Sequence, residues 1–141
     1  MRKFAVLWLW FLAALVSPAS AEVLDGIFDP PYKKPTELAR GSELRGALFD
    51  KLRAKTKKEV LFEGSLKAYR NWALFTGRTV DREGKSVTHP PHANDDAVGL
   101  WIRTRDGWTV VDYSFGHSDV FYLIWVEQYG VPKELLGMGG N

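Results

Sequence analysis

The alternation of apolar and polar residues predicts a helix, four strands and a second helix. Ser42 is a suitable N-cap residue, and beyond it apolar side chains recur at spacings of three and four. This apolar stripe consists of Leu44, Ala47, Leu48 and Leu52, and the charged residues from Arg45 to Lys55 fall largely off it. We therefore expect an amphipathic helix that starts at Ser42, ends by Lys57 and packs one face against the rest of the domain.

Four runs with a period of two follow this helix and predict strands. In the first run Val60, Phe62, Leu66 and Ala68 alternate with mostly polar neighbours, and a turn at residues 70–71 leads into a second run over residues 72–80. Residues 81–96 contain Gly84, two prolines and many polar residues, and predict a long loop. The runs 97–104 and 108–115 are joined by Arg105-Asp106-Gly107, which predicts a hairpin because Asp-Gly favours tight turns between strands.

The last apolar run, residues 120–126, fits either a buried helix or a buried strand by its periodicity alone. Ser118 and Asp119 as N-cap residues, with Gly130 and Pro132 as stop signals, favour a helix. The predicted fold class is therefore α+β: an N-terminal helix, a four-stranded antiparallel meander and a C-terminal helix.

Residues 1–21 read as a cleavable secretory signal peptide. Arg2 and Lys3 precede an apolar run over residues 4–16, and Ala19-Ser20-Ala21 supplies the small residues of a cleavage site. The run has 13 residues, and a membrane span needs about 20. We therefore expect an exported protein, in a periplasm or outside the cell, with no transmembrane segment after cleavage.

The remaining chain has the size of one domain. Residues 22–40 hold the prolines of Asp29-Pro30-Pro31 and Lys34-Pro35, which exclude a helix and a central strand, so they predict an extended N-terminal arm. Residues 41–141 are then a single α+β domain, within the usual size range of one hydrophobic core. The chain has no cysteine, which excludes disulfides, thiolate metal sites and a cysteine nucleophile.

The net charge of the chain gives little information about its partners. The chain has 19 Lys and Arg against 17 Asp and Glu, and loss of Arg2 and Lys3 with the leader leaves 17 of each. This balance argues against a nucleic-acid partner. Residues 33–58 are nevertheless basic, with nine cations against three acids. They predict either a solvated helix face or, around residues 51–58, a surface that contacts an anionic envelope component.

Both faces of the last two predicted strands carry large apolar groups. Strict alternation places Leu100, Ile102, Trp108 and Val110 in one set and Trp101, Val111, Tyr113 and Phe115 in the other. Three explanations remain open: helices cover both faces, the sheet curls around an apolar pocket, or a partner covers one face. If a face is open, the predicted ligand or partner face consists of Trp72, Trp101, Val111, Tyr113 and Phe115.

Several segments resemble a group of uncharacterised small exported bacterial proteins. The resemblance is carried by the helix from Leu44 to Arg53, by Trp72-Ala73-Leu74-Phe75, and by three later motifs: residues 107–112, 116–120 and 129–132. It covers most of the chain after the leader and implies a helix on a curved antiparallel sheet, a shape similar to cystatin-like domains. These motifs are caps, turns and strand cores, so the resemblance implies a fold and export, and no chemistry.

Candidate chemistry concentrates in the long loop. His89 and His92, followed by Asp95 and Asp96, have the donor types of a zinc or copper site, although polar surface loops often contain these residues without binding metal. His117 beside Ser118 and Asp119 does not predict a catalytic triad, because triad members converge in space and capping already explains the latter two residues. Among the carboxylates only Asp112 is unusual, since it interrupts an apolar run.

The sequence therefore predicts an exported cell-envelope protein with no enzymatic activity, a binding or accessory module that uses an apolar sheet face. An envelope protein, a second copy of the chain or a small apolar molecule are the partners left open. The alternative is a metal-binding protein, or a metal-dependent enzyme, that uses His89 and His92.

Overall fold

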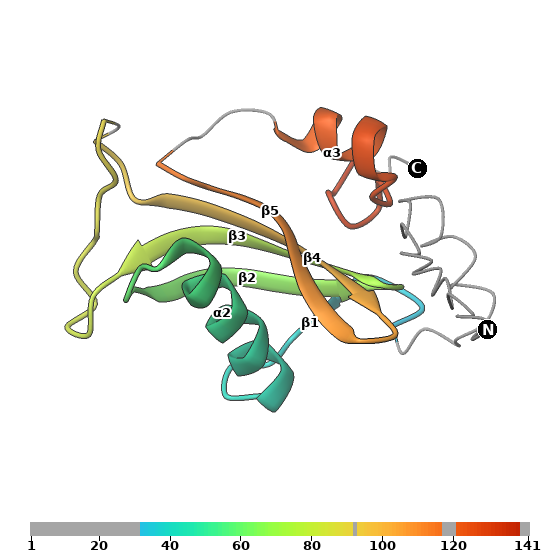
Figure 1. The fold of residues 1–141 in the computed structure, drawn as a ribbon, viewed down its shortest axis with the longest axis horizontal. Helices are drawn as coiled ribbons and strands as arrows, with labels where there is room; N and C mark the ends of the chain where they lie inside the picture. The colour runs from blue at the N-terminus through green and yellow to red at the C-terminus, as the bar shows by residue number, and fades with distance from the viewer. Residues whose placement is uncertain (1–31, 92, 117–120, 139–141) are drawn as a thin grey trace, which may run out of the picture.

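The computed structural model describes residues 32–91, 93–116 and 121–138. They form a five-stranded antiparallel meander in the order β1-β2-β3-β4-β5, with helix α2 on one face and helix α3 on the other (Figure 1). The elements are β1 (Thr36–Glu37), α2 (Glu43–Thr56), β2 (Leu61–Tyr69), β3 (Trp72–Val80), β4 (Asp96–Thr104), β5 (Gly107–Phe115) and α3 (Phe121–Tyr129). The predicted α+β class, the four-stranded meander and both helices are confirmed.

The arm contributes one strand that was not expected. Thr36 pairs with Ala68 and Glu37 with Lys67, so β1 adds a short fifth strand beside the second half of β2. Proline at position 35 stands just before this edge strand, where its missing N–H breaks no ladder. Predicted signal-peptide residues 1–21 lie outside the described residues, as does the arm up to residue 31.

Helix α2 has the predicted N-cap and the predicted end but a different buried face. Ser42 accepts a hydrogen bond from the Arg45 amide, and Lys57 ends the helix in the left-handed conformation. The stripe prediction is partly wrong, because Ala47 is exposed and Arg45 is buried. The buried residues are Arg45, Leu48, Phe49 and Leu52, at spacings of three and four.

A β-bulge changes which side chains of β5 share a face. Leu100 pairs with Asp112 but Trp101 pairs with Val110, so Val111 is an extra residue in β5. The side-chain alternation therefore reverses at this point. Trp108 and Val110 pack with Trp101 on the α2 side, whereas strict alternation placed them with Leu100.

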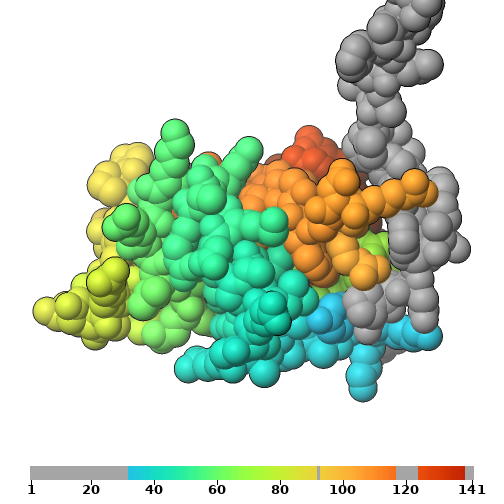
Figure 2. Space-filling view, turned by 60° about the horizontal axis from the view of Figure 1, so that its bottom comes forward, coloured from blue at the N-terminus to red at the C-terminus, as the bar shows by residue number. Residues whose placement is uncertain are grey.

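Each face of the sheet has its own apolar cluster. The cluster under α2 is built around Leu48, Leu52, Phe75 and Trp101, and α2 also contacts β5 (Figure 2). The cluster on the other face joins Trp72, Leu74 and Leu100 to Trp125 of α3 and to Val131 and Leu135 beyond it. The first of the three explanations therefore holds: helices cover both apolar faces. Among the described residues, no helix is long and apolar enough to cross a membrane.

Candidate functional site

The five residues of the predicted ligand face do not share one face. Trp101 and Phe115 belong to the cluster under α2, and Tyr113 lies against the Phe115 ring, with ring centroids 5.7 Å apart. Trp72 and Val111 belong to the cluster on the opposite face. Only Tyr113 of the five is exposed, so these residues offer no continuous apolar surface.

His89 of the predicted metal pair is a buried residue. Its Nε2 lies 2.6 Å from Thr79 Oγ1, its ring packs against Phe115, and its Nδ1 has no hydrogen-bond partner among the described residues. Burial lowers the pKa of His89, Lys58 lowers it further, and Asp95 acts in the opposite direction. The buried ring is therefore held neutral, and His92 lies outside the described residues.

The other candidate groups have structural partners or lie outside the described part. Asp112 Oδ2 accepts a hydrogen bond from Trp125 Nε1 at 2.9 Å, which ties α3 to β5. Ser114 is buried, and His117, Ser118 and Asp119 are outside the described residues. No three His, Cys, Asp or Glu residues of the described ranges are grouped as a metal site requires. Lys51, Lys55, Lys57 and Lys58 of the predicted basic surface are exposed.

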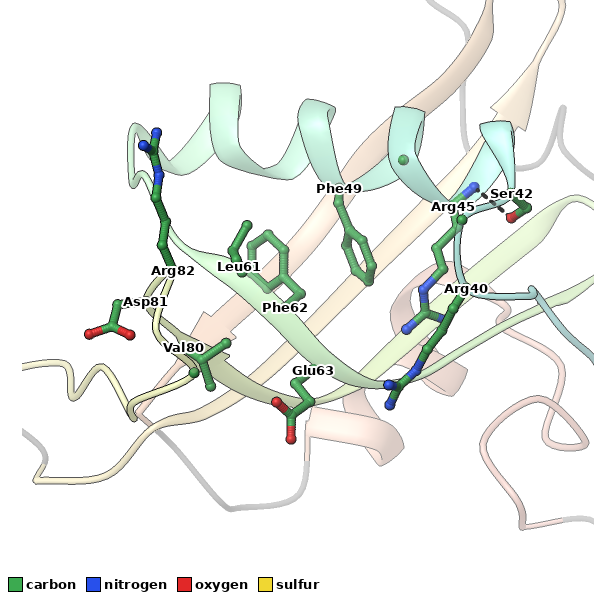
Figure 3. A pocket seen from close by; sticks show the side chains of 13 residues that line it. Arg40, Ser42, Arg45, Phe49, Leu61, Phe62, Glu63, Val80, Asp81 and Arg82 are labelled. Atoms are coloured by element: carbon green, nitrogen blue, oxygen red, sulfur yellow. Dashed lines mark hydrogen bonds between the residues drawn. The ribbon is translucent and has the colours of Figure 1, made fainter.

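The structure contains a groove that the sequence did not predict. It lies between the first half of α2 and the ends of β2 and β3, with a volume of about 510 Å³ (Figure 3). We call it the α2–β2 groove, and it falls within the usual size range of ligand pockets. It is lined by Arg40, Gly41, Ser42, Arg45, Gly46, Phe49, Leu61, Phe62, Glu63, Val80, Asp81, Arg82 and Gly84.

Aromatic rings form the base of the α2–β2 groove. Phe49 of α2 stacks on Phe62 of β2 with ring centroids 4.9 Å apart, and both rings contact Phe75 at the next layer down. Leu61 adds an apolar side chain that is 43% exposed. The base is therefore apolar, fixed by core packing and partly accessible.

Two arginines of α2 hold the helix against β2 on either side of Phe62. Arg45 donates hydrogen bonds to Leu38 O and Gly64 O, at 3.0 and 2.9 Å. Arg53 Nε donates to Val60 O at 2.7 Å, and its guanidinium lies over the Phe62 ring. Because both arginines bond fixed backbone carbonyls, the width of the groove is set by polar contacts as well as by packing.

The edge of β2 is unpaired along the groove. Strand β1 pairs only with Lys67 and Ala68, so on the edge away from β3 residues 61–65 have no strand beside them among the described residues. Leu66 bonds outward to Leu38 and Glu37, and the alternation of an antiparallel ladder turns the backbone groups of Gly64 and Phe62 outward too. Arg45 occupies Gly64 O, and the described residues provide no partner for the Phe62 N–H and C=O or the Gly64 N–H.

The charged groups around the groove differ in how far they are already paired. Glu63 forms an ion pair with Arg78 at 3.0 Å, and Asp81 Oδ1 accepts the backbone N–H groups of Glu83 and Lys85. Arg40 and Arg82, at opposite ends of the groove in Figure 3, form no ion pair or hydrogen bond with another described residue. The groove therefore has two free guanidinium groups, while Glu63 is ion-paired and Asp81 accepts backbone N–H groups but forms no ion pair among the described residues.

Gly46 lines the groove without a side chain that would fill it. Gly41 and Gly84, which also line it, have positive φ values of +79° that favour glycine. Gly46 is inside α2, where glycine is less favourable than alanine by about 1 kcal/mol, and a Cβ added there meets nothing within 4 Å. Neither the backbone nor packing requires glycine at this position, and a larger side chain would extend into the groove.

The arrangement suits binding more than catalysis. No nucleophile with a neighbouring base lines the groove: its serine, Ser42, caps α2, and its carboxylates have the partners described above. The sequence did carry two signals of this site, an arginine beside the apolar stripe of the first helix and a glycine inside that helix. Their meaning depends on the approach of residues 40–49, 61–63 and 80–84, which a single sequence does not show.

Comparisons of the chain with protein-family models, with curated proteins and with solved structures find no match. The coarse part of the resemblance to small exported bacterial proteins, a helix packed on an antiparallel sheet, is confirmed by the fold. Membership of that group stays a prediction.

Proposed function

We propose that this protein is an exported binding module without enzymatic activity, which receives a linear segment of a partner protein in the α2–β2 groove. The supporting observation is the groove itself, which combines an aromatic base, a neighbouring free strand edge and an uncommitted arginine at each end. Export and the cystatin-like resemblance enter this proposal from the sequence alone.

The proposed binding surface differs from the one expected from the sequence. The apolar sheet faces are covered by α2 and α3, so excess apolar area no longer argues for a partner there. The groove instead joins apolar and polar features within one concavity, which is the usual composition of a specific binding site. We prefer the groove to the metal-binding alternative, because Nε2 of His89 already contacts Thr79 Oγ1.

Position 46 offers a direct test. We expect linear peptides, selected from a displayed random dodecamer library on the purified mature protein, to bind Gly46→Trp at least tenfold more weakly than the unmodified protein. Gly46 lines the groove and a Cβ there has open space around it, so we expect the indole to occupy part of the groove. Gly46→Ala is the matched control: it adds a helix-favouring methyl group, raises stability by up to about 1 kcal/mol, and retains binding.

The readouts are peptide affinity by fluorescence anisotropy and folding by circular dichroism. If every selected peptide binds Gly46→Trp as tightly as the unmodified protein, the groove is not the binding site and the proposal fails. If selection returns no binding peptide, the proposal fails as well.

A further inference from the structure

The free edge of β2 displays a backbone pattern that matches one kind of ligand. Phe62 offers both its N–H and its C=O outward, and Gly64 offers its N–H, so three groups remain for an extended backbone beside residues 61–65. An exposed sheet edge of this kind can accept an additional strand. Beyond it, β1 already continues the ladder at Lys67 and Ala68, so a new strand would extend an existing row.

The charged side chains beside this edge indicate which residues an added strand would carry. Arg40 and Arg82 are exposed at the two ends of the groove, while Glu63 and Asp81 have internal partners. Carboxylates at either end of an incoming segment would therefore find free guanidinium groups. Residues 61–65 span about 13 Å at 3.3 Å per residue, so the matching stretch is about five residues long.

We propose that the partner segment binds as an added β-strand along residues 61–65 of β2, with acidic residues directed to Arg40 and Arg82 and an apolar side chain over Phe49 and Phe62. This inference rests on the function proposed above and specifies the binding mode and the partner chemistry. The space beside Gly46 receives the apolar side chain.

A second copy of the chain fits this edge less well than an acidic partner. Antiparallel pairing of two β2 edges would bring Arg40 of one copy toward Arg82 of the other. Both are positive, and of the carboxylates that line the groove Glu63 already pairs with Arg78 and Asp81 already accepts two backbone N–H groups within each copy. Like charges across an interface oppose association, so the acidic segment is the occupant that the charges favour.

Amide hydrogen exchange of the complex with the tightest selected peptide tests the strand directly. We expect exchange of the Phe62 and Gly64 amides to slow at least tenfold on binding, because both would become ladder donors. The Glu63 and Ser65 amides point toward β3 and serve as internal controls that change little. Two versions of the peptide are then compared, each N-methylated at every second amide so that together they cover all amides. An added strand uses only one of these two sets for the ladder, so only one version should keep its affinity.

Charge variants test the partner chemistry. The double variant Arg40→Gln and Arg82→Gln should bind the peptide at least tenfold more weakly and with less dependence on salt concentration. Lys51→Gln with Lys55→Gln, on the exposed side of α2, is the matched control and should leave affinity unchanged. Selected peptides should also be enriched in aspartate and glutamate.

The outcomes separate the two proposals. Peptides that bind and are excluded by Gly46→Trp, but leave the Phe62 and Gly64 amides unchanged, would overturn strand addition while the groove remains the binding site. Peptides without acidic residues, or an unaffected arginine double variant, would overturn the acidic partner. Protection of Phe62 and Gly64 that rises with protein concentration, without peptide, would assign the edge to a second copy and overturn this inference.

Discussion

The two faces of the sheet are covered in different ways. Helix α2 has 14 residues, a serine N-cap and a left-handed C-cap, and its arginines bond backbone carbonyls at Leu38, Val60 and Gly64. Helix α3 has nine residues, no acidic residue in its first turn and no basic residue in its last. Its Trp125 is fully buried and bonds Asp112.

This difference shows what polar and apolar contacts each contribute. Apolar packing removes a face from water but tolerates small shifts of the covering helix, because it is not directional. Hydrogen bonds from a guanidinium to fixed carbonyls determine where the helix lies. Both layers have directional hydrogen bonds, but α2 makes them through two arginines to three backbone carbonyls, and it is the layer that bounds the groove, so we expect it to be the more rigid of the two.

The largest difference between the two layers should appear when a central tryptophan is removed from each in turn. Trp101 is fully buried beneath α2, contacts Phe49 and donates from Nε1 to Leu48 O. Trp101→Ala should lower the free energy of unfolding by about 4 kcal/mol and destabilise the whole domain. Trp125→Ala should instead release α3 and residues 131–136, with the sheet and α2 still folded.

Chemical denaturation followed by far-ultraviolet circular dichroism, with amide exchange of α2 and α3, distinguishes these effects. Equal loss of protection in both layers after Trp125→Ala would show that the two layers unfold as one unit and contradict the comparison.

Removal of the Arg45 guanidinium is the next largest expected change. Arg45→Met keeps an apolar stem of similar length but leaves Leu38 O and Gly64 O without their donor. Unsatisfied buried polar groups cost about 1 to 3 kcal/mol each, so we expect a loss of about 3 kcal/mol by urea denaturation. Lys51→Met on the exposed side of α2 is the control, with a change within about 0.5 kcal/mol. Similar losses in both variants would show that the Arg45 hydrogen bonds do not stabilise the α2 layer.

Features that depend on a few neighbouring residues were predictable from the sequence, and features that depend on distant residues were not. The Asp106-Gly107 turn, the Ser42 cap and the Gly130 stop act within a few residues, and each is found where the pattern predicted it. The burial of Arg45 depends on carbonyls 7 and 19 residues away. The bulge at Val111 depends on pairing with β4, and it redistributes the side chains that strict alternation had placed on one face.

Loss of the Asp112–Trp125 hydrogen bond should change the stability of α3 and leave that of α2 unchanged. Asp112→Ala removes the acceptor Oδ2 of Trp125 Nε1 and the acceptor Oδ1 of the Tyr113 N–H, and Asp112 is not a member of the α2 cluster. Because a hydrogen bond to a charged group contributes about 1.5 to 3 kcal/mol, we expect α3 amides to exchange about tenfold faster or more. The amides of α2 should be unchanged, and faster exchange there would show that the two faces are coupled through β5.

The smallest expected effect is a pH dependence from His89, on the α2 side of the sheet. The folded protein keeps the ring neutral, since burial and then Lys58 lower its pKa below the ordinary 6.5, against the opposing effect of Asp95. Below about pH 6.5 the unfolded chain therefore binds a proton that the folded protein resists, so stability falls as the pH drops from 6.5 and is flat above it from this group. The slope from one proton is at most about 1.4 kcal/mol per pH unit.

Denaturation of the unmodified protein and of His89→Gln between pH 7.5 and 5 measures this slope. Glutamine can still hydrogen-bond Thr79 but does not titrate, so the variant should lose less stability than the unmodified protein over the acidic half of the range. Identical profiles would show that His89 takes up a proton equally easily in both states. Burial of the ring would then not disfavour its protonated form.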